Sequence, residues 1–239
     1  MIVVGICVHL DSMPLLPRAI RLWDQPAHSG VRIVVVFNGR LRPTILRELA
    51  ASVEQAAGPV EVIVRPNGHR SGFGPLSEAQ STLRRRTLQL RASHLLLHEV
   101  SRLPQDTSVL NELIAADGPI VGALYRDPYT LGEYCAFAFD PVWREHHSFG
   151  VVPEPLPAGP FVVPGIGFGF TLIRRDVLLE IDFRSGLHAA DSFFAYDASI
   201  AGFTILAVPT IIWNEKVDGR PDVLAAWHEA HHTSPSYAS

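Results

Sequence analysis

The sequence predicts an α/β fold, a single domain built on a mixed, mostly parallel β-sheet that is flanked by helices. Short apolar runs typical of buried strands alternate with amphipathic segments through the first half of the chain. Hydrophobic residues make up 47% of the sequence and charged residues only 18%, a balance typical of a well-buried globular protein. The 239 residues can form one substantial core, and we see no internal repeat and no domain linker. We therefore expect one domain over residues 1–239.

The first half contains candidate strands and helices in alternation. Apolar runs predict strands at residues 2–8, 32–37, 60–64 and 94–97. Helices are expected at residues 16–23, 43–56, 75–92 and 106–115. Pro43 and Pro75 stand in first turns, where proline fits, and Asp106 is a candidate cap. This order predicts parallel strands with helices on both faces. Right-handed crossovers then bring the loops that follow the strands to one edge, where such sheets bind ligands.

The second half is less regular. Residues 125–164 are rich in proline and aromatic residues, and they predict a long excursion over the expected cleft. After it we expect a strand at 165–173, a short helix at 176–181, a helix at 191–201 and a final strand at 204–213. The chain ends in a Ser- and Pro-rich tail.

Charge and cysteine content argue against several classes of protein. The formal net charge of −4 gives no basic field for nucleic acid or membrane, and the run at residues 84–86 is the one dense basic patch. Cys7 and Cys135 make neither a disulfide framework nor a zinc site, and we expect both to be reduced and buried. The chain begins directly with a core strand, and no apolar stretch approaches the ~18 residues that a membrane span needs. We expect a soluble, cytoplasmic protein.

Residues 165–169, Gly-Ile-Gly-Phe-Gly, look superficially like a dinucleotide-binding loop. A strand-like run follows them instead of the helix that such a loop requires. We therefore expect these glycines to allow the backbone to approach a ligand closely.

Four segments together carry a more specific resemblance. Residues 34–39 (Val-Val-Val-Phe-Asn-Gly) end a strand in an Asn-Gly turn, and residues 70–74 (Arg-Ser-Gly-Phe-Gly) open a helix. Residues 103–106 read Leu-Pro-Gln-Asp, and residues 164–175 join the glycine run to Leu-Ile-Arg-Arg. This order resembles the family 2 glycosyltransferases, nucleotide-sugar transferases of the Rossmann-like GT-A fold, over roughly residues 2–215.

The resemblance implies a nucleotide-binding half at about 1–118, an acceptor-side half at about 119–220 and a short tail. The nucleotide-sugar-binding residues that it implies are His9, Asp11, Asn38, Arg70, Gly72, Phe73, Gly74, His98 and Glu99. Backbone N–H groups at a helix start suit a diphosphate, although an ordinary loop-to-helix turn would also look like residues 70–74. On the acceptor side the resemblance implies Gly167, Phe168 and Gly169. Trp143 and Tyr125 either stack on the acceptor or cover the site.

The metal motif departs from the family pattern. Residues 98–100 read His-Glu-Val where the family has Asp-x-Asp, so Glu99 is the one carboxylate left. A divalent cation that bridges phosphates prefers oxygen ligands, which puts a need for Mg²⁺ or Mn²⁺ in doubt. His98 and Glu99 could still hold Mn²⁺, or they could simply end a strand. Alternatively, Arg70 or Arg102 neutralises the leaving diphosphate without a metal.

A second departure lies at the end of the last strand. The family places a metal-binding histidine there, whereas this chain has Asn214 or Glu215. Both departures favour weak, altered or absent metal binding.

Asp191 is the candidate general base. It lies eleven residues before a Gly-Phe pair at 202–203, the spacing that follows the base in inverting members, and Ala190 replaces the usual Glu. A carboxylate at a helix start is also an ordinary cap.

The resemblance therefore implies a hexosyltransferase that moves a sugar from a nucleotide-diphosphate donor, such as a UDP-sugar, to an acceptor hydroxyl, with inversion. A non-catalytic nucleotide-sugar-binding protein and a nucleotidyltransferase stay open as alternatives. The acceptor is a small molecule, a saccharide, a peptide or a modified DNA base.

Overall fold

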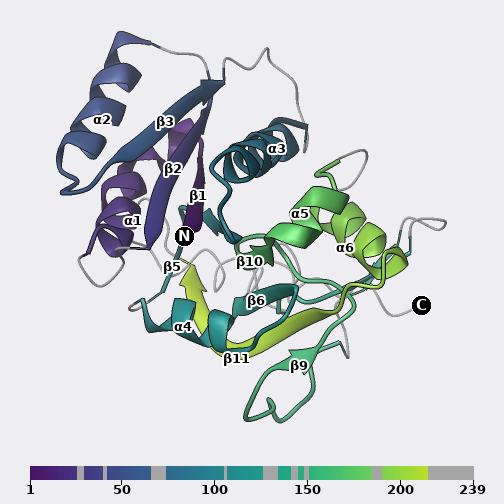
Figure 1. Ribbon diagram of the computed structural model, residues 1–239. Helices are drawn as coiled ribbons and strands as arrows, with labels where there is room; N and C mark the ends of the chain where they lie inside the picture. Colours follow the sequence, from purple (N-terminus) through teal and green to yellow (C-terminus); the bar gives the residue numbers. More distant parts are fainter. Residues whose placement is uncertain are drawn as a thin grey trace, which may run out of the picture.

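The computed structural model describes residues 1–25, 30–39, 42–65, 74–104, 107–125, 134–140, 145–147, 151–184 and 190–214. A mixed β-sheet runs through this part of the chain in the strand order β3-β2-β1-β4-β10-β6-β11-β5, with β9 paired to β11 (Figure 1). The strands of this sheet are β1 (Ile2–Val8), β2 (Val31–Asn38), β3 (Val60–Arg65), β4 (His94–Glu99), β5 (Arg102–Leu103), β6 (Ile120–Tyr125), β9 (Phe161–Val162), β10 (Phe170–Arg174) and β11 (Ile205–Asn214).

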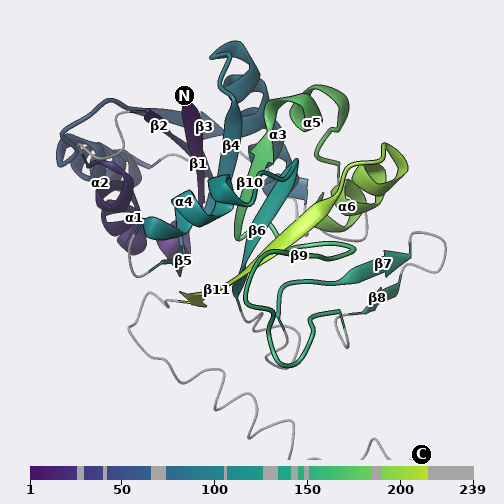
Figure 2. The same ribbon diagram turned by 60° about the horizontal axis from the view of Figure 1, so that its bottom comes forward.

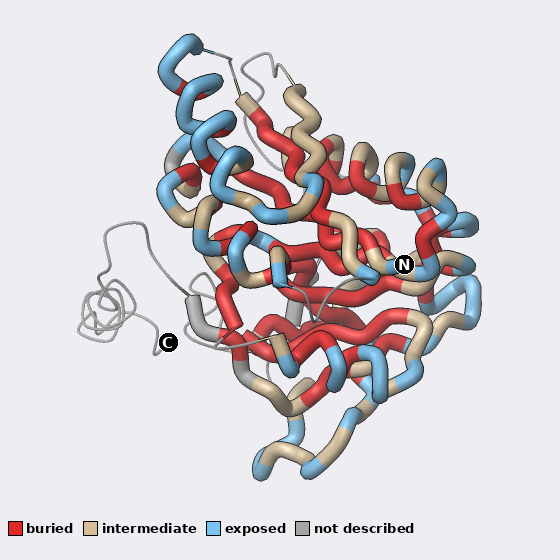
Figure 3. Tube along the Cα trace, turned by 60° about the vertical axis from the view of Figure 1, so that its left-hand side comes forward, coloured by how far each residue is buried: buried red, intermediate tan, exposed pale blue. Residues whose placement is uncertain are grey.

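Helices cover both faces of the sheet. They are the 3₁₀ turn η1 (Leu10–Leu15) and the helices α1 (Leu16–Trp23), α2 (Pro43–Glu54), α3 (Gly74–Gln89), α4 (Ser108–Ala115), α5 (Arg175–Glu180) and α6 (Ala190–Ile200). In Figures 1 and 2, α1, α2 and α4 lie on one side of the sheet, whereas α3, α5 and α6 lie on the other. The strands between them are mostly buried, and the exposed residues concentrate on the helices (Figure 3).

The directions of the strands show which strand ends share one edge of the sheet. Strands β1, β2, β3 and β4 run parallel to one another. Strand β10 is antiparallel to both β4 and β6, and β11 is parallel to β6. It follows that β1, β2, β4, β6 and β11 all end at one edge, where β10 begins.

The predicted fold class is confirmed, and the predicted elements are mostly confirmed within one to three residues. Strand β6 was not predicted, although its six residues are apolar enough to be buried throughout. The region 125–164 is not wholly irregular, since it contains β9 and the small antiparallel pair of β7 (Ala138–Asp140) and β8 (Glu145–His147), seen at the lower right of Figure 2. The cap of α4 is Thr107, and the predicted cap Asp106 lies outside the described residues.

The basic run of α3 is engaged in ion pairs. Arg84 pairs with Asp182 and donates to the backbone oxygen of Leu178, and Arg86 pairs with Glu61 at 2.7 Å. These contacts favour a structural role for the run. Both Cys7 and Cys135 are buried, as predicted. No helix in the described ranges combines the length and the apolar character needed to cross a membrane.

Candidate functional site

Asn38 connects two of the predicted nucleotide-binding segments. It is the last residue of β2, is 5% exposed, and donates from Nδ2 to the backbone oxygen of Pro75, 2.8 Å away in the first turn of α3. Its Oδ1 is buried and has no hydrogen-bond donor in the described part of the chain. A buried acceptor without a partner is costly, so this oxygen is suited to a ligand donor at the strand end.

The end of β1 leads into η1. His9 is exposed there, and its backbone N–H donates to the Ser12 hydroxyl, which donates back to the His9 carbonyl. The backbone of Asp11 lies in the same 3₁₀ turn, at the sheet edge that Asn38 also reaches. Both residues therefore follow the end of β1, and their contact with a nucleotide stays a prediction.

His98 lies in the core. It is 1% exposed, and its Nδ1 accepts a hydrogen bond from the indole N–H of Trp23 at 3.0 Å. Because indole is only a donor, Nδ1 is unprotonated, and Nε2 carries the proton that it shares with the Arg102 carbonyl at 2.8 Å. Burial lowers the pKa of His98 to about 4, partly offset by the bond to Arg102. Both ring nitrogens thus make hydrogen bonds inside the fold, so neither is available to bind a metal ion.

Glu99 ends the same strand but is turned outward. Its side chain is 46% exposed and accepts a hydrogen bond from the Ser101 hydroxyl at 2.7 Å. The Arg102 Nε lies 3.5 Å from Glu99 Oε2. The Arg102 guanidinium also lies over the ring of Tyr125, with its central carbon 4.5 Å from the ring centroid. Glu99, Arg102 and Tyr125 therefore form one group at the edge.

Asp191, the predicted base, comes from α6. It occupies the first turn of α6, is half-buried, and accepts a hydrogen bond from the Ser192 N–H at 2.9 Å. Burial raises the pKa of Tyr125 well above its usual value, and the charge of Asp191 contributes to this rise together with Cys135 and Glu99, against Arg102. The predicted base and the end of β4 thus lie within electrostatic range of one tyrosine.

The glycine run packs against that tyrosine. Gly169 donates its N–H to the Tyr125 hydroxyl at 3.1 Å, and a Cβ at Gly169 would lie 2.7 Å from the ring. A Cβ at Gly167 would lie closer still to the Tyr125 hydroxyl, while Phe168 is buried against Phe183. Close packing on Tyr125 therefore accounts for Gly167 and Gly169, and the close ligand approach that the sequence predicts stays a prediction. The Phe168 side chain lies in the core.

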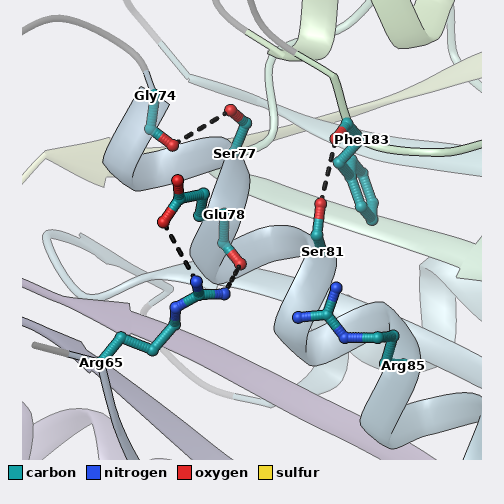
Figure 4. A pocket seen from close by; sticks show the side chains of 7 residues that line it. All are labelled: Arg65, Gly74, Ser77, Glu78, Ser81, Arg85 and Phe183. Carbon is teal, nitrogen blue, oxygen red and sulfur yellow. Dashed lines mark hydrogen bonds and ion pairs between the residues drawn. The ribbon is translucent and has the colours of Figure 1, made fainter. Parts of the chain in front are cut away.

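A pocket of about 420 Å³ lies beside the first half of α3 (Figure 4). It is lined by Arg65, Gly74, Ser77, Glu78, Ser81, Arg85 and Phe183. The Arg65 guanidinium is fixed by Glu78, at 3.1 Å from its carboxylate, and by the Thr82 hydroxyl at 2.6 Å. Of these lining residues, Gly74 is the one that the sequence also predicts to bind the nucleotide sugar. The sequence analysis did not predict the other pocket residues of α3, which are Ser77, Glu78, Ser81 and Arg85. Their spacing of three or four residues, which puts them on one face of the helix, was the signal that could have identified them.

Arg70, Gly72, Phe73 and Trp143 lie outside the described residues. Within the described ranges, no group of three or more His, Cys, Asp or Glu side chains could hold a metal ion.

Several solved structures share this arrangement of strands and helices. GalNAc-T7, solved with UDP, GalNAc and Mn²⁺, matches 92% of this chain with a TM-score of 0.67 and 16% identity. The mannosyltransferase PcManGT from Pyrobaculum calidifontis, solved with GDP-Man and Mn²⁺, matches 95% with a TM-score of 0.57 and 14% identity. The chain has the GT-A fold. A mycobacterial protein also shares the fold, with a TM-score of 0.55 and 16% identity over 95% of this chain.

The GT-A domain described here spans 44% of GalNAc-T7, 59% of PcManGT and 71% of the mycobacterial protein. No protein-family model and no curated protein matches the chain in sequence. At these identities the likeness establishes the fold, and the activity has to be argued from the site.

Proposed function

We propose that this chain is a glycosyltransferase that moves a hexose from a nucleoside-diphosphate donor to an acceptor hydroxyl, with inversion at the anomeric carbon. The observation that carries the proposal is the carboxyl edge of a GT-A sheet, where Asn38 ends β2 and Glu99 ends β4, together with a carboxylate, Asp191, in the first turn of α6. Open α/β sheets bind their ligands at that edge. GT-A neighbours that contain UDP or GDP-Man support a nucleotide-sugar donor for this chain as well.

On the donor side, Asn38 and the start of α3 are the parts that suit the nucleotide. The Asn38 carbonyl oxygen is a buried acceptor without a described donor, next to the first turn of a sixteen-residue helix. The amino end of a helix favours negative charge through its free N–H groups and its dipole. The diphosphate would lie beside Gly74 at the start of α3, with His9 and Asp11 on the nucleoside side.

On the acceptor side, Asp191 would act as the general base. Its carboxylate takes the proton of the acceptor hydroxyl while the hydroxyl oxygen attacks the anomeric carbon. The bond from that carbon to the diphosphate oxygen breaks, and its electron pair leaves with the diphosphate.

The residues at the end of β4 do not fit a metal that bridges two phosphates. Such an ion prefers several oxygen ligands. Glu99 supplies the one carboxylate there, His98 is committed to Trp23 and Arg102, and Val100 is buried. We therefore assign no step to a divalent cation, although two neighbours contain Mn²⁺.

Asp191→Asn tests the proposed base. We expect transfer to fall by about 10²–10⁴-fold while the affinity for the nucleoside diphosphate stays within about twofold, since general-base catalysis contributes that much and the amide keeps the shape. Asp197→Asn is the matched control on the same helix, because Asp197 pairs with Arg184 at 2.6 Å. Full transfer activity of Asp191→Asn would show that Asp191 is not the general base.

The donor itself can be found by thermal shift with a panel of nucleotide sugars, because a ligand that binds the native state raises the unfolding temperature. Release of nucleoside diphosphate from the best binder then separates an enzyme from a protein that binds donors without turnover.

A further inference from the structure

Arg102 is a buried cation whose charge is poorly matched by the protein around it. Its side chain is 8% exposed, and in the described part of the chain its Nε has no hydrogen-bond acceptor. The Glu99 carboxylate is 3.5 Å from Nε, beyond a good hydrogen bond, and is itself half-exposed and bonded to Ser101. A buried guanidinium kept only for structure is expected to have its donors satisfied.

Arg102 lies close in the sheet to the ends of β4 and β11. Strand β5 brings it opposite Asn214, the last residue of β11, and it lies three residues after the end of β4. These are the two strand ends where the sequence resemblance implies metal ligands, and where this chain lacks the second carboxylate and the histidine. The backbone of Arg102 is therefore paired with one of these strand ends, and its guanidinium lies beside Glu99 at the other.

The surroundings hold the guanidinium in place. It stacks over Tyr125 at 4.5 Å, the Tyr125 hydroxyl is fixed by the Gly169 N–H, and the Arg102 carbonyl is fixed by His98. A planar guanidinium held in this way can donate parallel hydrogen bonds to phosphate oxygens, which is the geometry in which arginine binds phosphate best. His98, which sequence reasoning took for a ligand, positions the backbone of this arginine.

We propose that the guanidinium of Arg102 binds the donor diphosphate and stabilises it as the leaving group, in the place of a divalent cation. The inference rests on the proposed function. The anomeric carbon–oxygen bond breaks with its electron pair on the diphosphate, and the acceptor oxygen forms the new bond and gives its proton to Asp191. Arg102 stays protonated throughout and donates hydrogen bonds to the developing charge.

The two ways of holding a diphosphate predict opposite effects for Glu99→Gln. If Glu99 holds a metal, loss of its charge weakens diphosphate binding. If Arg102 is the cation, the Glu99 carboxylate competes with phosphate for the guanidinium, and its neutralisation raises the affinity.

The experiment measures the affinities of UDP, GDP, uridine and guanosine by calorimetry, first in EDTA and then in MnCl₂. The proteins are the wild type, Glu99→Gln, Arg102→Met and Arg102→Lys. Arg174→Met is the matched control, because Arg174 pairs with Asp176 at the opposite edge of the sheet. Circular dichroism and the unfolding midpoint establish that each variant is folded.

We expect the wild type to bind the preferred nucleoside diphosphate equally well in EDTA and in MnCl₂. Arg102→Met should weaken the affinity for the nucleoside diphosphate by about tenfold or more, because a charge-assisted hydrogen bond is lost. The affinity for the nucleoside alone should stay unchanged. Arg102→Lys should recover part of the affinity, and Glu99→Gln should raise it.

Three results would overturn the inference. First, the nucleoside diphosphate could bind only in MnCl₂, with its binding lost in Glu99→Gln. The protein would then be a metal-dependent glycosyltransferase in which Arg102 does not replace the cation. Equal loss of nucleoside and diphosphate in a folded Arg102→Met would make the residue structural. If no nucleoside diphosphate binds the wild type in either buffer, the proposed function fails and the inference fails with it.

Discussion

His98 should make the stability of the fold depend on pH in a defined range. Its pKa is about 4 in the folded protein, against 6.5 for an ordinary histidine, because burial disfavours the charged ring. The unfolded chain therefore takes up the proton first as pH falls. The stability that neutral His98 contributes is complete above about pH 6.5 and is lost between about pH 6.5 and pH 4.

The size of the effect follows from the two pKa values. Linkage gives a loss of about 2 kcal/mol at pH 5, approaching about 3 kcal/mol below pH 4. Part of this loss comes from one contact. If Nδ1 of His98 were protonated, its N–H would face the indole N–H of Trp23, and two donors cannot form a hydrogen bond.

The measurement is urea unfolding at pH 7, 6 and 5 for the wild type and for His98→Gln. Glutamine offers one acceptor and one donor and does not titrate in this range. The wild type should lose about 2 kcal/mol more than the variant between pH 7 and pH 5. Equal losses in the two proteins would refute the view that His98 is a neutral core residue.

Three further substitutions test the packing that positions the site. Gly169→Ala should destabilise the fold by about 1–3 kcal/mol, since its Cβ would lie 2.7 Å from the Tyr125 ring, and thermal unfolding would show it. Phe194→Ala should cost about 3–5 kcal/mol in urea unfolding, because this ring is 1% exposed; a loss below about 1 kcal/mol would contradict the core assignment. Trp23→Phe removes the indole donor to His98 and should cost about 1–3 kcal/mol while raising the pKa of His98, measurable by NMR titration.

The sequence was sufficient for the elements whose periodicity is local. Strand β1 is found over the predicted residues 2–8, and α2 begins at Pro43 as expected from the fixed backbone angle of proline. Strand β6 escaped prediction because Ile120–Tyr125 is a short apolar run beside a long irregular region. The antiparallel direction of β10 depends on how distant segments pair, which local periodicity does not contain.

The candidate site shows the same division. Spacing indicated Asn38 and Glu99 as strand-end residues and Asp191 as a helix-start residue, and the structure has each of them there, because strand ends and helix starts are readable from local patterns. The environment of His98 depends on Trp23, seventy-five residues away, so its neutral and buried state could not be read from a histidine in a motif position. The glycine run was read as a ligand contact because the ring of Tyr125 lies forty-four residues from Gly169 and reaches it only in the folded chain.

The most direct test of the account is release of nucleoside diphosphate from the nucleotide sugar that stabilises the wild type most. The wild type should release it, Asp197→Asn should match the wild type, and Asp191→Asn should be slower by about 10²–10⁴-fold at unchanged affinity. Binding of the donor without release by the wild type would contradict catalysis, and equal release by both aspartate variants would contradict the proposed base.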